Sequence, residues 1–196
     1  ATNLQVGEGV DMTTPEIPRP TSGDVVDLIL DDHRLFEALL RELRDATADR
    51  EAAREALAHA LIAHGEAEEE KVYTQLNRKR AITKHEAEHG EEEHAEGHEA
   101  LLALLECKGT DTQKFDDAVE DLATALNHHI GEEEQTILNP ARTEVSEEVR
   151  QDLGVKWATE RNRLLEAGVG TLTNVREIVA RAHKEGLLPA DDEGED

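Results

Sequence analysis

Apolar residues recur along most of this chain at the spacing of an amphipathic helix. From Phe115, the residues Val119, Leu122 and Leu126 follow at steps of four, three and four, which marks the inward stripe of a bundle helix. Stripes of this kind, with their flanking caps and breakers, predict four long helices over residues 21–46, 49–78, 83–107 and 112–138. Two further helices are predicted over 146–167 and 173–184.

Local signals set the expected helix ends. Thr21 or Ser22 is the expected cap of the first helix, and Thr83 and Glu86 have the spacing of a capping box at the start of the third. Because a residue before proline avoids the helical conformation, the fourth long helix is expected to stop ahead of Pro140.

Four long helices with short connections favour an all-α fold, an up-down antiparallel four-helix bundle with additional C-terminal helices. The C-terminal helices, with Trp157, are expected either to cover the bundle or to form a dimer interface. The predicted organisation is an extended N-terminal arm (1–20), the bundle (21–140), a C-terminal helical extension (141–188) and an acidic, disordered tail (189–196).

Each long helix carries a histidine on its inward stripe, where an apolar residue is expected. The stripe that passes through Leu126 continues to His129 and Glu133, and the second helix repeats this His-x-x-x-Glu spacing. The inward polar residues are His33, His64, Glu68, His94, His98, His129 and Glu133. Residues four apart on a helix are neighbours, so each His-x-x-x-Glu pair can direct both side chains at one inner site.

A buried carboxylate without a partner costs several kcal/mol, so these residues need a common explanation. A lone inward histidine is usually a hydrogen-bonded core residue, but the coincidence on four helices favours a cation in the bundle centre. The donors exceed what one tetrahedral zinc binds, and they suit two ions of higher coordination number bridged by carboxylates. Imidazole and carboxylate without thiolate suit iron.

Four short segments together resemble the hemerythrin-like HHE cation-binding domain over roughly residues 24–140. They are Asp-Asp-His-Arg at 31–34, His-Gly-Glu-Ala-Glu-Glu at 64–69, Glu-Glu-Glu-His-Ala-Glu at 91–96 and His-Ile-Gly-Glu-Glu-Glu at 129–134. The resemblance implies a four-helix bundle that holds an oxo- or hydroxo-bridged di-iron centre. It implies terminal ligands at His33, His64, His94 and His129, and bridging carboxylates at Glu68 and Glu133.

Two positions stay open within that resemblance. His94 and His98 have the His-x-x-x-His spacing of the five-histidine oxygen carriers, whereas the four-histidine iron-centre repair type lacks the second histidine. In the last segment the oxygen carriers place their carboxylate five residues after the histidine, at Glu134, while the inward stripe favours Glu133.

Three other interpretations compete with the di-iron centre. Residues 85–89 read His-Glu-Ala-Glu-His, the HExxH spacing of zinc hydrolases, but they stand at a helix start among acidic residues. A ferritin-like site needs Glu-x-x-His on two different helices, and both examples here lie on the third helix. The third alternative is a metal-free structural bundle.

Charge and cysteine content narrow the expected partners. A net charge of −25 argues against nucleic acid and anionic membranes, and a single cysteine, Cys107, weakly favours a cytoplasmic protein without disulfides. We expect a monomer or homodimer. The expected function is to bind, sense or handle a small oxidant (O2, peroxide or NO) at two iron ions, and catalase-like peroxide removal is the enzymatic alternative.

Overall fold

The computed structural model describes residues 15–190, and every regular element within that range is helical. The helices are α1 (Val25–Arg44), α2 (Arg50–Glu68), α3 (Thr74–Arg78), α4 (Lys84–Leu105), α5 (Gln113–Glu133), α6 (Asn139–Glu144), α7 (Glu147–Glu166) and α8 (Leu172–Glu185). Two π-helical segments, η1 (Glu69–Tyr73) and η2 (Glu134–Leu138), join α2 to α3 and α5 to α6. The predicted all-α fold is confirmed. Most of the predicted N-terminal arm and acidic tail lies outside the described residues.

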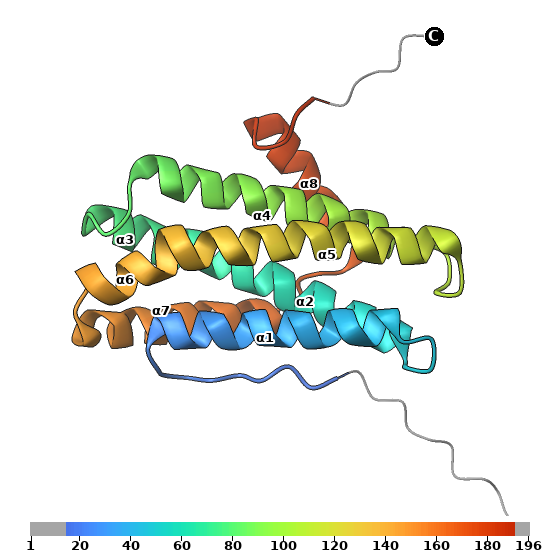
Figure 1. Ribbon diagram of the computed structural model, residues 1–196, viewed down its shortest axis with the longest axis horizontal. Helices are drawn as coiled ribbons and strands as arrows, with labels where there is room; N and C mark the ends of the chain where they lie inside the picture. Colours follow the sequence, from blue (N-terminus) through green and yellow to red (C-terminus); the bar gives the residue numbers. More distant parts are fainter. Residues whose placement is uncertain (1–14, 191–196) are drawn as a thin grey trace, which may run out of the picture.

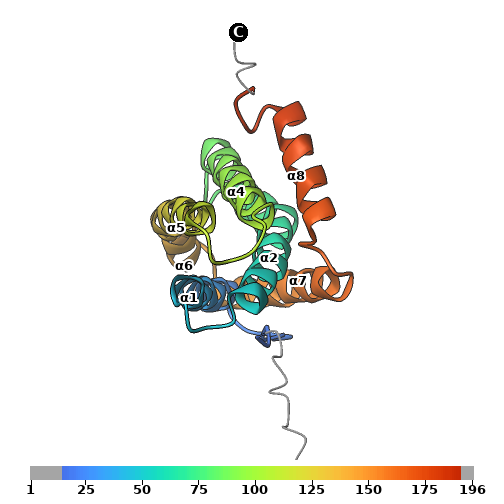
Figure 2. The same ribbon diagram turned by 90° about the vertical axis from the view of Figure 1, so that its right-hand side faces the viewer.

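Helices α1, α2, α4 and α5 form the bundle. Each packs against two neighbours, α1 on α2 and α5, and α4 on α2 and α5. Figure 1 shows them running up and down along the long axis, and the end view of Figure 2 shows the four around a common centre.

The capping signals were partly right. Thr83 and Glu86 form the predicted capping box at the start of α4. The predicted cap of α1 at Thr21 or Ser22 is wrong, because Asp24 caps this helix by accepting a hydrogen bond from the Val26 N–H at 3.0 Å.

The predicted stop before Pro140 is also wrong, because helical structure continues to Glu144. The π-helical turn of η2 lets the Asn139 N–H donate to the Glu134 carbonyl, five residues back. Pro140 then falls in the first turn of α6, where a missing backbone N–H costs little.

Two apolar clusters fill the bundle, one on each side of its middle. On α1, Val25 to Ile29 belong to one cluster and Phe36 to Leu43 to the other. Along α5 and η2, Phe115 to Leu126 belong to one cluster and Ile137 to the other. The inward histidines other than His98 lie between the two clusters along their helices, so hydrocarbon separates them from solvent at both ends.

The helices after residue 145 cover the bundle. Helix α7 packs against α1 and α2 and buries Trp157 completely, and α8 packs against α4 (Figure 2). No helix in the range 15–190 has the length and apolar character needed to cross a membrane.

Candidate metal centre

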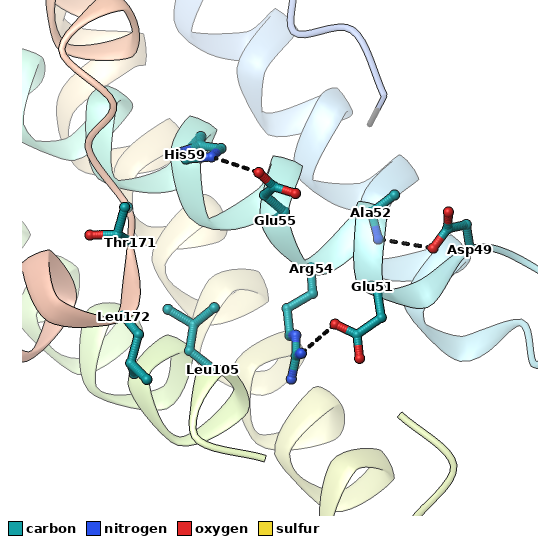
Figure 3. A pocket seen from close by; sticks show the side chains of 10 residues that line it. Asp49, Glu51, Ala52, Arg54, Glu55, His59, Leu105, Thr171 and Leu172 are labelled. Carbon is teal, nitrogen blue, oxygen red and sulfur yellow. Dashed lines mark hydrogen bonds and ion pairs between the residues drawn. The ribbon is translucent and has the colours of Figure 1, made fainter. Parts of the chain in front are cut away.

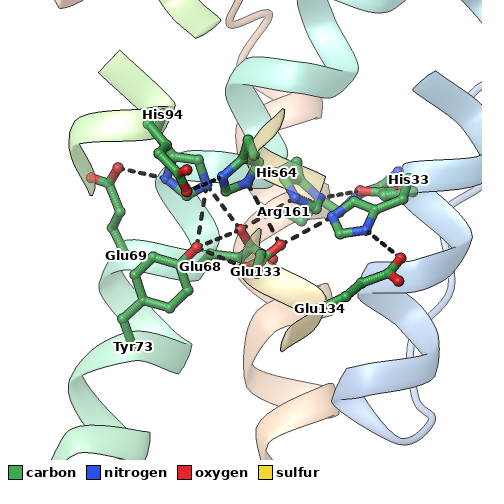
Figure 4. Close-up of polar contacts among 12 residues, drawn as sticks. His33, His64, Glu68, Glu69, Tyr73, His94, Glu133, Glu134 and Arg161 are labelled. Carbon is green, nitrogen blue, oxygen red and sulfur yellow. Dashed lines mark hydrogen bonds and ion pairs between the residues drawn. The ribbon is translucent and has the colours of Figure 1, made fainter. Parts of the chain in front are cut away.

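Six of the seven predicted site residues meet in the middle of the bundle (Figure 4). All are buried, with at most 4% of each residue exposed. We call them the buried cluster: His33 from α1, His64 and Glu68 from α2, His94 from α4, and His129 and Glu133 from α5. Their donor atoms form two overlapping groups, and within each group every atom lies within 4.8 Å of the others.

The cluster has two similar halves, each built around one glutamate. Glu68 Oε2 lies 3.2 Å from Nε2 of His64 on its own helix and 3.1 Å from Nε2 of His94 on α4. Glu133 Oε2 lies 3.6 Å from Nε2 of His129 on its own helix and 3.1 Å from Nε2 of His33 on α1. Each half therefore combines a His-x-x-x-Glu pair with one histidine from another helix.

Several atoms at the centre have no hydrogen-bond partner among the described residues. They include Nε2 of His33, His64 and His129, Oε1 of Glu68 and Oε2 of Glu133. A buried polar atom without a partner costs about 1–3 kcal/mol, and more when it is charged. Because the unpartnered atoms are imidazole nitrogens and carboxylate oxygens that face one another, the donor set fits bound cations.

Three of the histidines are held from behind by carboxylates. Their Nδ1–H groups donate outward, which directs each Nε2 at the centre. The outer carboxylates are Asp32 on His64 at 3.0 Å, Glu69 on His94 at 2.8 Å and Glu93 on His129 at 3.2 Å. These carboxylates lie inside three of the four segments that resemble the family, but the helical pattern does not show which histidine each of them contacts.

Glu133 and Glu134 lie in different environments, although they are neighbours in the sequence. The Glu133 side chain is fully buried at the centre, whereas that of Glu134 is 46% exposed and lies 3.9 Å from Nδ1 of His33. Glu133, and not Glu134, is thus the carboxylate on the buried side of the helix, as the inward stripe of the sequence predicts.

His98 belongs to neither donor group. Its ring lies parallel to that of His94, with centroids 6.2 Å apart, and it lines a cavity of about 40 Å³ beneath α8. Burial and the nearby histidines lower the pKa of His98 to about 3, so it is a neutral imidazole. The structure thus does not bring this predicted fifth histidine to the centre.

Tyr73 is a member of the site that sequence reasoning missed. Its hydroxyl donates to Glu133 Oε1 at 2.7 Å, and its oxygen lies 3.4 Å from His94 Nε2 and 3.5 Å from Glu68 Oε2. In a regular α-helix, five residues after Glu68 is about 140° away from the inward stripe. The π-helical segment η1 changes that register, as such segments often do at functional sites.

Two histidines of the cluster, His64 and His94, favour the charged form when no cation is present. Burial lowers the pKa of His64, but Glu68 and Asp32 outweigh that effect and raise it to about 9. The pKa of His94 is likewise well above its usual range, since Glu68 and Glu69 overcome its burial. Burial raises the pKa of Glu68, but His64 and His94 bring it below the ordinary value. A cation at this position would replace protons on the imidazoles.

Other candidate sites lack such a donor set. In the HExxH segment, His85 is exposed and the Glu86 carboxylate accepts the Thr83 N–H at 2.6 Å as part of the capping box. A cavity of about 470 Å³ is lined by residues of α2, Leu105 and the segment before α8 (Figure 3), and it shares no lining residue with the buried cluster. Neither the segment nor this cavity contributes to the donor groups found within residues 15–190.

The comparisons with known proteins point to the same part of the chain. A family model described as "Hemerythrin HHE cation binding domain" matches residues 24–140, more than half of the sequence. Neither the search of curated proteins nor the search of solved structures found a match. Residues 24–140 contain all six members of the buried cluster and end before α7.

Proposed function

Because this chain belongs to the hemerythrin HHE cation-binding family, we propose that its buried cluster holds two iron ions and binds a small oxidant. The observation that carries the proposal is the pairing of two His-His-Glu halves whose inner atoms lack partners. His33, His64, His94 and His129 would be terminal ligands, and Glu68 and Glu133 would bridge. Cys107 belongs to neither donor group within residues 15–190, and its thiol donates to the Ala103 carbonyl on α4.

The enclosure of the cluster limits the ligand to a very small molecule. Apolar clusters close both ends of the bundle around it, and each of its six members is at most 4% exposed. Neither the cavity of about 470 Å³ nor the cavity of about 40 Å³ beneath α8 is lined by any member of the cluster. A ligand must therefore fit among closely packed side chains, which O2, peroxide and NO do more readily than an organic substrate.

The count of histidines favours handling of peroxide or NO over reversible oxygen transport. With four terminal histidines, both iron ions keep coordination positions for an outside ligand. The iron pair would supply redox chemistry, while the chain supplies the enclosure and the Tyr73 hydroxyl, which donates a hydrogen bond to Glu133 Oε1. Catalase-like turnover of peroxide is the enzymatic form of the same proposal.

The deciding experiment measures metal content and visible absorption of protein purified without oxygen, before and after air is admitted. We expect about two irons per chain and new charge-transfer bands in air. His64→Ala should lose iron, and His85→Ala, an exposed histidine at the start of α4, should not. A single zinc, or no metal after incubation with iron, would overturn the proposal.

The same preparations distinguish binding from turnover. Rapid O2 release from added peroxide by the iron-loaded protein, lost in His64→Ala, would identify a catalase-like enzyme. A stable spectral change on adding NO or peroxide, without turnover, would identify a binding or sensing protein.

A further inference from the structure

Helix α7 reaches the buried cluster through one buried arginine. Arg161 Nε lies 2.7 Å from Asp32 Oδ2, and its Nη2 lies 2.6 Å from Oδ1, so the two side chains form a two-point ion pair. The side chains of Arg161 and Asp32 are 1% and 7% exposed. Asp32 Oδ2 also accepts the Nδ1–H of His64 at 3.0 Å, which completes a chain from α7 through α1 to α2.

The guanidinium is fixed on its other sides as well. Its Nη1 donates to the Pro18 carbonyl at 2.9 Å, and its plane stands over the Trp157 ring, with the guanidinium carbon 5.5 Å from the centroid. The Trp157 ring in turn meets the His64 ring edge to face, at 5.7 Å and 88°. Helix α7 therefore touches His64 directly through Trp157 and indirectly through Arg161.

The other outer carboxylates lack such a holder. Glu69, behind His94, is 31% exposed, and no arginine or lysine within residues 15–190 forms an ion pair with it or with Glu93, behind His129. Glu93 Oε1 instead lies 3.5 Å from Nε2 of His89 and 3.2 Å from Nε2 of His128, two histidines at the surface. The support behind His64 is therefore the most rigid of the three.

We propose that Arg161 is a positioning residue of the metal centre, which through Asp32 fixes the direction of the His64 ring, so that α7 completes a site whose ligands lie in the family segment. The inference rests on the proposed metal-binding function. The two-point contact holds both Asp32 oxygens in one plane and leaves a defined lone pair for the His64 Nδ1–H.

A purely structural arginine would give a different result, and the chain offers a matched control. Arg150 is also on α7 and also pairs with an aspartate at the start of α1, with Nε 2.7 Å from Asp24 Oδ2. Asp24 caps α1 and contacts none of the cluster histidines. Arg150→Met therefore removes a comparable link between α7 and α1 without affecting His64.

The test compares Arg161→Lys, Arg161→Met, Asp32→Asn and Arg150→Met in the full chain. Lysine retains the charge but cannot make the two-point contact. After loading with Fe(II) or Co(II), the rate of metal transfer to a chelator is measured beside the melting temperature of the metal-free protein. Loss of an outer partner of a ligand histidine typically weakens metal binding about 10- to 100-fold.

We expect faster metal release, by about 10- to 100-fold, in both Arg161 variants and in Asp32→Asn, and an unchanged rate in Arg150→Met. The double variant of Arg161→Met with Asp32→Asn should release metal no faster than the single variants, because both act through one contact. In a zinc-loaded sample, the NMR signal of the His64 Nδ1 proton should move in Arg161→Lys and stay in Arg150→Met.

If the Arg161 variants only melt earlier, with the same release rate and the same His64 signal as Arg150→Met, Arg161 is structural and the inference is wrong. If the unmodified protein takes up no metal, the proposed function itself fails, and that result is distinct from the first. If Arg161→Met does not fold, Arg161→Lys and the near-isosteric Asp32→Asn decide the question.

Discussion

The Tyr73 hydroxyl donates a hydrogen bond to Glu133 Oε1 at 2.7 Å, across the bundle and between residues 60 apart in the sequence. The contact depends on η1, which begins directly after Glu68, just as η2 begins directly after Glu133. The two π-helical segments therefore follow the two central carboxylates. Among residues 15–190, no hydroxyl group other than that of Tyr73 forms a hydrogen bond with the buried cluster.

Tyr73→Phe tests what this hydroxyl contributes. Removing a hydrogen bond to a buried carboxylate should lower the free energy of unfolding of the metal-free protein by about 2 kcal/mol. In metal-loaded protein the loss should be smaller, because a cation stabilises the Glu133 charge. Denaturant unfolding in both states measures the difference, and an equal loss in the two states would contradict this role.

The pair Glu133→Gln and Glu134→Gln tests which carboxylate serves the centre. Glu133 is buried between His33 and His129, while Glu134 stands partly in solvent behind His33. We expect Glu133→Gln to reduce iron content to about one ion or less per chain, and Glu134→Gln to retain nearly all of it. The iron content of both variants is measured after identical reconstitution. Loss of iron in Glu134→Gln but not in Glu133→Gln would show that Glu134 is the metal ligand.

His98→Ala and His94→Ala form a second matched pair, one helical turn apart and similarly buried. His94 faces Glu68 at the centre, whereas His98 lies towards α8 outside both donor groups. His94→Ala should therefore lose iron, and His98→Ala should bind two ions with an almost unchanged spectrum. Loss of one ion in His98→Ala would show that a fifth histidine binds after all.

The stability of the metal-free protein should depend on pH in a defined direction. The pKa of His64 is raised to about 9, so its ion pair with Glu68 stabilises the fold fully below the ordinary value near 6.5 and is lost as pH rises through 9. The loss is on the order of 3 kcal/mol. Melting temperatures from pH 6 to 10 should therefore fall, and His64→Leu should flatten that dependence.

Iron affinity should change in the opposite direction. Because a metal must displace the proton of His64, affinity should rise with pH up to about 9 and then level off. Chelator competition at several pH values measures it. An affinity that does not change between pH 6 and 8 would show that metal binding displaces no proton from His64.

Gly154→Ala tests how closely α7 packs on the bundle. A Cβ at this position would lie 1.8 Å from the Gly23 carbonyl oxygen, a backbone atom just before α1. The two segments must separate, so we expect a loss of about 3 kcal/mol in unfolding free energy. Gly131→Ala on α5 is the control, since nothing lies within 4 Å of its Cβ. It should be neutral or stabilising by up to about 1 kcal/mol.

The sequence by itself determined the helices and the inward direction of the cluster residues. Both follow from the helical period, which is local: a histidine in register with Leu122 and Leu126 faces the same side as they do. The His-x-x-x-Glu pairs are local for the same reason. Once the helices pack into a bundle, the polar positions of their stripes must meet.

Contacts between helices were decided only by the tertiary structure. Asp32 stands next to His33 in the sequence but accepts a hydrogen bond from His64, and helical periodicity does not identify that partner. His98 shares a stripe with His94, yet the rotation of α4 directs it to the cavity beneath α8.

Tyr73 and Arg161 show the physical reason most clearly. A π-helical turn, which helical periodicity does not predict, brings Tyr73 to Glu133, and the packing of α7 brings Arg161 to Asp32 over a separation of 129 residues. Local spacing fixes where a side chain points around its own helix. Which partner it meets depends on how separate helices are rotated and shifted against one another.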